Sequence, residues 1–345
     1  MKPHYFIIGI LWWGAVSCGH KAPRVITPAF YYWKQTWSGN PEEQSYLKNL
    51  PARRLYVKLF DVTTNEITQA PVPVAVFRQK APLPEQVDIV PVVFLMNEVW
   101  AHADTTLAGK VSRLIQELCD SLPSSRIPEV QLDCDWTQTT RDAYFSFIRQ
   151  IRQTPFFRRR RLSVTIRMYQ VKYAVRTGIP PADRGLLMCY NMGDLRQAGA
   201  HNSILDLGTM EAYLGKNRVA GYPLPLDVAL PLFEWSVLFH NNGTAYAGIL
   251  RNIGTTELQD TGVFTPGKER LYTVRQDTSL NGYTLKKGNV IRRETIELST
   301  LESSARLVAE QLSTKDPVVI FYHLDAMTLQ KYPLNELQKI YHLFD

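Results

Sequence analysis

Two aspartates stand two residues apart in the segment 130–137, VQLDCDWT. The neighbouring residues are mostly apolar, so the segment is interpreted as a buried strand, where a carboxylate is costly without partners. Residues two apart in a strand point the same way, so Asp133 and Asp135 should share one face. Two such charges cannot both ionise freely, so the pKa of one carboxyl should rise. That pair can hold a proton for acid catalysis near neutral pH.

Eight apolar runs, each ending in polar or aromatic residues, predict the strands that position these acids. Long apolar runs are typical of strands covered on both faces, and they lie at 29–33, 55–60, 89–96, 130–136, 162–169, 185–192, 227–235 and 318–325. The amphipathic stretches between them predict helices, most clearly at 41–50, 105–121, 139–153, 301–313 and 334–343. Strands that alternate with helices eight times predict an α/β fold, a (β/α)8 TIM barrel over 28–345.

Two segments do not fit the repeating strand-helix unit. Residues 66–85 carry a further apolar run flanked by prolines, which predicts an extra hairpin or edge strand. Residues 241–300 contain repeated turn signals such as Asn242-Gly243 and Asn281-Gly282. They predict a β-rich insertion between the seventh and eighth strands, at about 241–300.

The active site of such a barrel lies at the carboxyl ends of its strands. We expect Asp135 to act as general acid and Glu234, at the end of the seventh strand, as its nucleophilic or basic partner. Asp133 and Tyr190 would position these groups and tune their pKa values. Alternatively, Asp133 is a structural carboxylate bonded to Tyr190, and Glu234 stabilises a helix N-terminus. The residues expected to contact substrate are Trp33, Asp61, Glu98, Trp136, Arg167, Tyr169, Asn191, Trp235 and Asp325.

Aromatic residues gather at the same strand ends. Sugar rings present C–H faces that stack on aromatic planes, while their hydroxyls need polar partners, so this mixture predicts a carbohydrate cleft. Trp33, Trp136 and Trp235 are the expected sugar platforms. The alternative is that these aromatic side chains fill the tops of the strands and pack under loops.

The segment LDCDW (132–136) resembles the D-x-x-D-x-D-x-E signature of family-18 chitinase-like barrels. Asp133 and Asp135 match its second and third acids, whereas Val130 replaces the first and Thr137 stands at the glutamate. Met188-Cys189-Tyr190-Asn191 is similar to the Met-x-Tyr-Asp of that family, with asparagine in place of the last aspartate. The resemblance implies a barrel that acts on polysaccharide.

The glutamate of that family protonates the leaving group, and a substrate acetamido group is the nucleophile. Thr137 cannot donate a proton in this way. The departure leaves open a two-carboxylate hydrolase, a non-catalytic barrel that binds glycan or a partner, and a structural lipoprotein without a ligand. The layout of 28–345 also resembles a family of uncharacterised bacterial lipoproteins with glycosidase-like barrels.

The first eighteen residues, MKPHYFIIGILWWGAVSC, have a basic residue, an apolar run and then small residues. This pattern predicts a secretory signal peptide over 1–18, followed by a tether over 19–27. The cysteine after Ala15-Val16-Ser17 resembles a lipobox, although Ala15 replaces the usual leucine. That resemblance implies acylation of Cys18 and a membrane-anchored lipoprotein of the bacterial cell envelope. An ordinary signal peptide cleaved nearby is the alternative.

The formal net charge of +7 is scattered along the chain, and the one dense basic run is Arg158–Arg161. We interpret that run as a solvated loop and helix end, with contact to an anion or to lipid as the alternative. Since no nucleic-acid motif accompanies it, we expect no nucleic-acid partner. Three cysteines remain besides Cys18, and an odd number argues against a disulfide framework. No metal-ligand spacing, phosphate-binding loop or dinucleotide fingerprint is present, so we expect no metal or cofactor, and a monomer.

Overall fold

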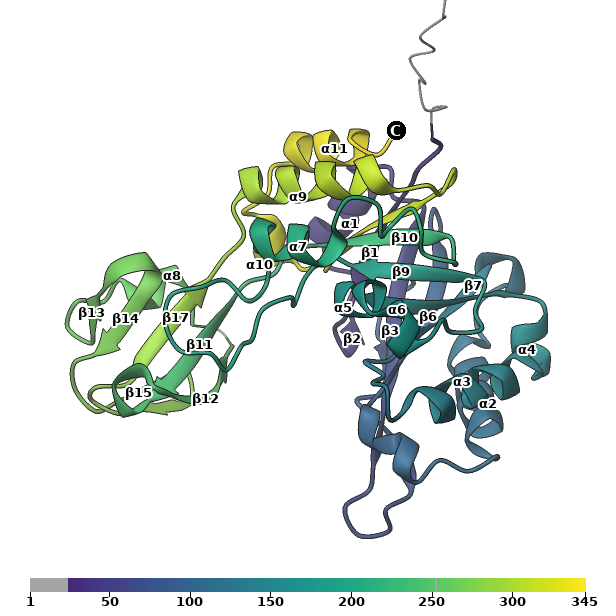
Figure 1. The fold of residues 1–345 in the computed structure, drawn as a ribbon, viewed down its shortest axis with the longest axis horizontal. Coiled ribbons are helices and arrows are strands. Elements are labelled where there is room, and N and C mark those ends of the chain that lie inside the picture. The colour runs from purple at the N-terminus through teal and green to yellow at the C-terminus, as the bar shows by residue number, and fades with distance from the viewer. Residues whose placement is uncertain (1–23, 252) are drawn as a thin grey trace, which may run out of the picture.

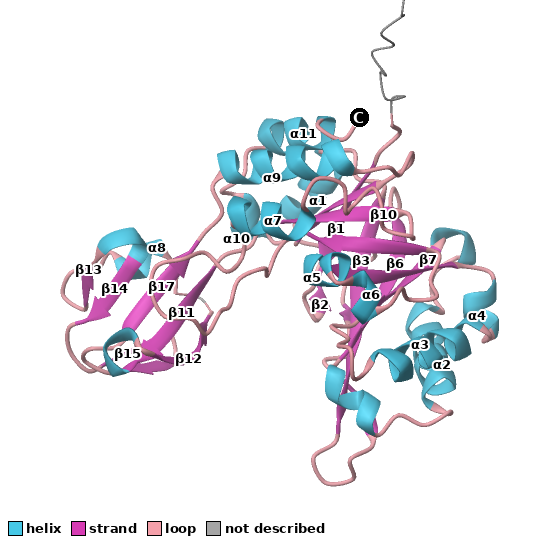
Figure 2. Cartoon of the chain, viewed as in Figure 1, coloured by secondary structure: helices cyan, strands magenta, loops and turns pink. Residues whose placement is uncertain are grey.

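The computed structural model of the protein describes residues 24–251 and 253–345, so the predictions for the signal peptide and for Cys18 lie outside the described residues. Within them, eight parallel strands form a closed ring. Figures 1 and 2 show these strands surrounded by helices. The ring closes because β1 pairs with both β18 and β3. The predicted (β/α)8 barrel is therefore confirmed. Its strands are β1 (Thr27–Tyr32), β3 (Arg54–Thr64), β6 (Asp88–Leu95), β7 (Glu129–Asp133), β8 (Arg161–Arg167), β9 (Arg184–Met188), β10 (Leu226–Pro231) and β18 (Val318–Tyr322).

Helices cover the outside of the ring, and those predicted most clearly from sequence are all present. They are α1 (Pro41–Asn49), α2 (Leu107–Cys119), α3 (Arg141–Arg152), α9 (Leu298–Gln311) and α11 (Leu334–His342). The Asn40 side chain caps α1 by accepting hydrogen bonds from the backbone N–H groups of Glu42 and Glu43. In α2 the apolar residues Val111 and Ile115 recur at helical spacing and are buried against the barrel.

A second, antiparallel sheet lies beside the barrel, between β10 and β18 in the chain (Figure 1). It contains β11 (Trp235–His240), β12 (Ala245–Leu250), β13 (Phe264–Pro266), β14 (Leu271–Val274) and β17 (Val290–Glu294), and the hairpin β15 (Thr278–Leu280) and β16 (Tyr283–Leu285) lies in the same segment. The sheet buries a small core of its own that includes Leu238, Phe264 and Ile291. Because β10 ends at Pro231, Trp235 belongs to this sheet and not to the barrel.

The segment predicted as an extra edge strand pairs with the far end of β3. Strand β4 (Pro71–Val74) runs antiparallel to β3, and β5 (Arg78–Gln79) pairs with β2 (Thr36–Trp37). The residues that follow β1 and β3 therefore build up one side of the barrel mouth.

The interior of the barrel is polar along β7 and β8, although the sequence was interpreted there as continuously apolar. Glu129, Gln131 and Asp133 alternate with Val130 and Leu132, which are fully buried in the hydrophobic core. Tyr31 of β1 donates a hydrogen bond to Gln131 and Tyr56 of β3 donates to Glu129, which shows that these side chains point across the interior.

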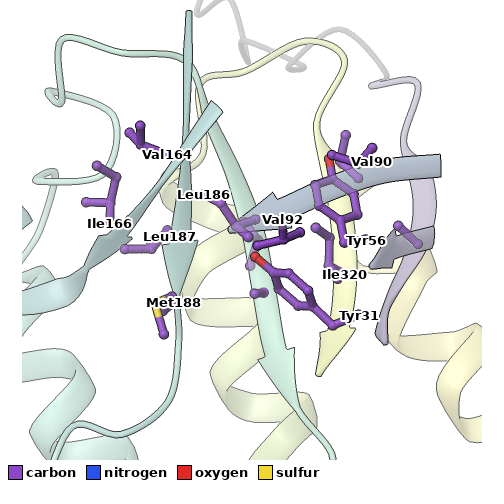
Figure 3. Packing of buried hydrophobic residues seen from close by; sticks show 14 of the residues in the cluster. Tyr31, Tyr56, Val90, Val92, Val164, Ile166, Leu186, Leu187, Met188 and Ile320 are labelled. Atoms are coloured by element: carbon purple, nitrogen blue, oxygen red, sulfur yellow. The ribbon is translucent and has the colours of Figure 1, made fainter. Parts of the chain in front are cut away.

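Strand β8 supplies matching polar groups beside this column. Ser163 donates a hydrogen bond to Glu129 (2.6 Å), and Gln131 donates to Ser163 (3.2 Å). Apolar side chains such as Val164 and Leu187 pack around the strands, with Tyr31 and Tyr56 nearby (Figure 3). The polar side chains of β7 and β8 thus line the interior from the strand starts towards the mouth, and Glu129, Ser163 and Gln131 are joined by hydrogen bonds.

At the amino-terminal end of the barrel, charges are buried in pairs. Two guanidinium nitrogens of Arg184 lie 2.6 and 3.0 Å from the Asp227 carboxylate, and both side chains are almost inaccessible. The backbone N–H of Val318 also donates to Asp227 (2.7 Å). Arg54 pairs with Glu129 at 3.0 Å. Each buried carboxylate therefore has enough donors to offset the cost of its burial.

Candidate functional site

A cavity of about 140 Å³ opens at the carboxyl ends of the barrel strands. It lies where the active site of such a barrel is expected. Its walls come from β1, β6, β7, β8, β9 and β18 or from the residues that follow them. The lining residues are Tyr31, Trp33, Phe94, Asp133, Asp135, Arg167, Met188, Tyr190, Asn191 and Tyr322. The structure therefore brings together Trp33, both aspartates, Arg167, Tyr190 and Asn191 from the sequence prediction.

An aromatic cluster centred on Tyr322 forms one wall of the cavity. The ring centroid of Tyr322 lies 5.2 Å from that of Tyr190, 5.5 Å from that of Trp33 and 5.6 Å from that of Tyr31. The Trp33 ring is only partly buried, and the ammonium of Lys58 lies 5.4 Å from its centroid. Trp33 thus keeps part of its surface exposed at a cavity that tyrosines also line, and such a mixture of aromatic and hydroxyl groups can bind a sugar ring.

Asp133 lies at the base of the cavity and is nearly inaccessible to solvent, with 7% exposure. Its carboxyl accepts a hydrogen bond from the Thr165 hydroxyl at 2.6 Å. Burial, and then the charge of Asp135, raise the pKa of Asp133 to about 7. Asp133 thus exists in both protonation states near neutral pH and can donate or accept a hydrogen bond towards the cavity. The proton-holding member of the aspartate pair is therefore Asp133.

Asp135 forms a bidentate ion pair with Arg167. The Nε and Nη2 atoms of Arg167 both donate to its carboxylate, the second at 2.5 Å. Arg167 also reaches the backbone oxygen of Asn191 at 3.4 Å. Although burial opposes it, the hydrogen bonds to Asp135 raise the pKa of Arg167. Both Asp135 oxygens accept from the guanidinium, so neither is placed as a proton donor.

Glu234 is not among the residues that line the cavity. Its carboxylate forms ion pairs with Arg293 and Lys331, and 19% of its side chain is exposed. The chain leaves the barrel after Pro231, so Glu234 follows the last barrel residue instead of ending a barrel strand. The expected pairing of Asp135 and Glu234 across one cavity is corrected accordingly.

Trp136 is also placed differently from the sequence prediction. It is 2% exposed, its indole N–H donates to the Thr177 backbone oxygen (3.0 Å), and its ring packs against Tyr144 and Phe145. Because β7 ends at Asp133, the chain turns before Trp136 and directs it into the helix layer. It has no face open to a sugar, so its prediction as a platform is wrong.

The remaining predicted contact residues lie around the rim and have partners within the protein. Asp61 pairs with Lys58 at 2.8 Å, and Glu98 accepts from Thr63 at 2.9 Å. Asp325 pairs with Lys34 at 2.6 Å and caps the short helix α10 (Ala326–Leu329). These side chains are not among the lining residues of the cavity.

Two predicted aromatic contacts lie outside the cavity. Tyr169 is 41% exposed on α5 (Met168–Lys172), where its ring packs against Tyr173. The Trp235 indole donates to Glu294 at 3.0 Å, so that ring is tied to the second sheet. Neither residue is part of the cavity wall.

Thr137 occupies the position of the glutamate in the motif that the sequence resembles. Its hydroxyl lies 2.8 Å from that of Thr139 and 3.2 Å from that of Thr140, and its side chain is exposed. Thr140 in turn donates to Asn97 (2.7 Å). These bonds hold the threonine side chains to one another, and no carboxylate occupies this position.

The sequence analysis overlooked residues that support the cavity. Thr165 orients Asp133 by donating a hydrogen bond to it, and below Asp133 the Gln131 side chain accepts a hydrogen bond from the Tyr31 hydroxyl. Their signal was present as the strict alternation of polar and apolar residues over 129–135 and 161–167.

A second overlooked group connects the cavity to the second sheet. Glu294 of β17 accepts hydrogen bonds from the backbone N–H (2.8 Å) and the hydroxyl (2.7 Å) of Ser203. Arg292 donates to the backbone oxygens of Gln197 (2.6 Å) and Gly199 (3.0 Å). The loop that begins at the cavity residue Asn191 is thereby fastened to the second sheet.

Other kinds of site find little support in the described part of the chain. No group of three or more histidine, cysteine, aspartate or glutamate side chains there is arranged to hold a metal ion. None of its helices combines the length and the apolar character needed to cross a bilayer. Cys119, Cys134 and Cys189 are buried free thiols. Hydrogen bonding and aromatic stacking are the interactions that the cavity offers.

Comparison with solved structures finds a similar barrel fold in spore cortex-lytic enzymes and in GH18 chitinases. The spore cortex-lytic enzyme SleL of Bacillus cereus superposes with a TM-score of 0.52 at 12% identity, over 94% of this chain and 75% of that one. SleL of Bacillus megaterium gives 0.54 at 11% identity, over 93% and 75%. A mutant GH18 chitinase from Cycas revoluta in complex with (GlcNAc)4 gives 0.51 at 13% identity, over 91% and 99%. No family model and no curated protein matches the chain.

Proposed function

We propose that this protein binds a saccharide in the cavity at the barrel mouth and holds it without cleaving it. The observation that carries the proposal is that a partly exposed tryptophan, Trp33, and an asparagine whose side-chain oxygen has no partner line the same cavity. The Asn191 side-chain oxygen is buried and has no hydrogen-bond partner among the described residues. Because Asn191 lines the cavity, a shift of its side chain on binding would let this oxygen accept a hydrogen bond from a sugar hydroxyl or amide N–H.

Three features favour binding over hydrolysis. Asp135 is engaged by Arg167 with both oxygens, Thr137 replaces the acid of the related motif, and Glu234 is engaged by Arg293 and Lys331. A two-carboxylate hydrolase needs an acid and a second carboxylate that flank the same bond. The expected pair does not line this cavity.

The fold of the neighbours suggests which saccharides to test first. The Cycas revoluta chitinase was solved with (GlcNAc)4, and the two SleL proteins are named spore cortex-lytic enzymes. N-acetylglucosamine oligomers and soluble peptidoglycan glycan strands are therefore the first ligands for calorimetric titration of the full chain. Saturable binding supports the proposal. The proposal is contradicted if neither series gives a heat of binding and a wider glycan array shows no bound protein.

Tyr190→Phe is expected to weaken saccharide binding by about fivefold to tenfold, because it removes one hydroxyl from the cavity and little packing. Tyr144→Phe is the matched control, since the Tyr144 hydroxyl is equally buried but contributes nothing to the cavity lining. Its affinity should equal that of the wild type. Equal affinities for all three proteins would show that the ligand lies elsewhere.

Hydrolysis is the second candidate, and one observation favours it. A carboxyl with a pKa of about 7, as in Asp133, is protonated often enough to act as a general acid. If the protein cleaves glycans, release of reducing ends should fall as the pH rises through 7 and should be lost in Asp133→Asn. Binding without release of reducing ends between pH 5 and 8 would exclude this candidate.

We also propose that the domain is anchored to a bacterial envelope membrane through acylated Cys18. The motif at residues 15–18 supports this location. Cells that express the full chain and are fed a labelled fatty acid should incorporate the label into the protein, and Cys18→Ser should abolish incorporation. Release of the wild-type protein as an unlabelled soluble form would contradict the anchor.

A further inference from the structure

We propose that the amino-terminal face of the barrel, where the parallel strands begin, lies against an anionic lipid surface. The inference rests on the proposed acylation of Cys18 and is independent of saccharide binding. Two observations carry it, namely where the chain enters the barrel and which charges that face exposes.

The described chain begins at this face and is fixed to it. The Arg24 guanidinium donates to the backbone oxygens of Ala309 (2.9 Å) and Leu312 (2.7 Å), and the Val25 N–H donates to Lys315 (3.1 Å). Strand β1 starts two residues later, at Thr27.

The short connection to Cys18 limits how far the face can lie from the membrane. Cys18 and Arg24 are six positions apart in the sequence, and even a fully extended chain of that length spans only about 20 Å. The start of the barrel therefore stays close to the bilayer that holds the acyl chains. Val25, which is 76% exposed, lies on the same side.

The exposed charges of this face are mostly basic. We call Arg53, Arg158, Arg159, Arg161 and Lys315 the basic face; all five are exposed and lie at or just before the starts of strands. Backbone hydrogen bonds join the same ring of segments, since Arg53 donates to Pro28 (2.8 Å) and Arg161 donates to Pro128 (3.1 Å).

Acidic residues cancel only part of this charge. Asp183 and Asp316, which precede β9 and β18, form ion pairs with Arg152 and Arg184. Glu85 precedes β6 and Asp88 begins it, and the exposed acids Glu310 and Asp345 follow residues whose backbone oxygens contact Arg24. The positive charge of the basic face is therefore concentrated at Arg158, Arg159 and Arg161. Lysine and arginine near an anionic leaflet are attracted to it within a Debye length, so the basic face complements such a surface. The saccharide cavity, at the other ends of the strands, then points away from the lipid.

The test uses the full acylated chain reconstituted into vesicles and compares two fluorescent probes. One probe is attached at Ser313→Cys, on the proposed lipid side, and the other at Ile67→Cys, in the exposed loop between β3 and β4. Figure 1 shows that loop at the opposite end of the molecule from the start of the described chain. A quencher carried on the lipid headgroups should quench the probe at 313 more strongly than the probe at 67.

The preference should depend on lipid charge. Stronger quenching at position 313 is expected on vesicles that contain phosphatidylglycerol. The difference between the two positions should decrease at high salt and should be small on pure phosphatidylcholine. Reversing Arg158, Arg159 and Arg161 to glutamate should lower the population of this orientation by about fivefold or more for each charge. The matched control reverses Lys80, Lys268 and Lys287, which are equally exposed but lie near the mouth and in the second sheet.

Three results would overturn the proposal. Equal quenching at both positions would show no preferred orientation. A preference that persists unchanged on neutral vesicles, or after reversal of the three arginines, would show that the basic face is not responsible. Failure of the full chain to associate with any vesicle would remove the anchor on which the proposal rests, while leaving saccharide binding in solution untouched.

Discussion

Replacing Asp227 with alanine is expected to destabilise the protein by about 3–5 kcal/mol, because it removes the buried carboxylate that accepts two hydrogen bonds from the buried Arg184 guanidinium. The Arg184 and Asp227 side chains are 7% and 1% exposed, so the pair is shielded from solvent. The substitution also removes the acceptor of the Val318 N–H. Urea unfolding of the full chain, followed by tryptophan fluorescence, measures the change.

Asp316→Ala provides a matched control because it removes another partner of the same arginine. The Asp316 carboxylate lies 3.2 Å from Arg184, but its side chain is 67% exposed. A solvent-exposed ion pair contributes about 0–1 kcal/mol. If Asp227→Ala lowers the free energy of unfolding by as little as Asp316→Ala does, the buried pair does not stabilise the barrel.

The stability of the wild type is expected to fall by about 3–4 kcal/mol relative to Asp133→Asn as the pH rises from 4.5 to 8. Burial raises the pKa of Asp133 from the ordinary value of 3.8 to about 7. The folded protein therefore binds more protons than the unfolded chain between these two values. The stabilisation is complete below pH 3.8, decreases as the pH rises, and is lost above pH 7.

Asparagine cannot ionise, so the variant should lack this part of the pH dependence while keeping the bond to Thr165. Urea unfolding of both proteins across the pH range gives the difference directly, and contributions from other groups cancel. Glu98→Gln, which alters an exposed carboxylate at the rim, should retain the wild-type profile. Parallel profiles for the wild type and Asp133→Asn would contradict the raised pKa of Asp133.

The ring of strands could be predicted from sequence because each strand carries enough apolar residues to mark it. The limits of the strands were less predictable, and two errors follow from them. Strand β7 stops at Asp133 and β10 at Pro231, so the residues beyond these points follow turns that no local pattern indicates. Trp136 and Glu234 lie just past these ends, and tertiary contacts decide their positions.

Part of the site depended on contacts that no sequence pattern reveals. Asp133, Asp135 and Tyr190 could be placed together because parallel strands end at one mouth. The loop after Asn191 is held by hydrogen bonds from Ser203 to Glu294, which lies about ninety residues further along the chain. A single sequence does not show such a contact. By contrast, the polar column of β7 was visible as alternation and was missed because the strand was treated as apolar on both faces.

That alternation makes the length of β7 matter more than the identity of most of its residues. Substituting one member of the column changes only the hydrogen bonds of that side chain, whereas adding or deleting a single residue within 130–132 reverses which side chains face the interior. Val130 or Leu132 would then face the partners of Gln131 and Asp133, and carboxylates would be placed in the hydrophobic core between the strands and the helices. Relatives that keep this interior should differ freely in composition here but not in strand length.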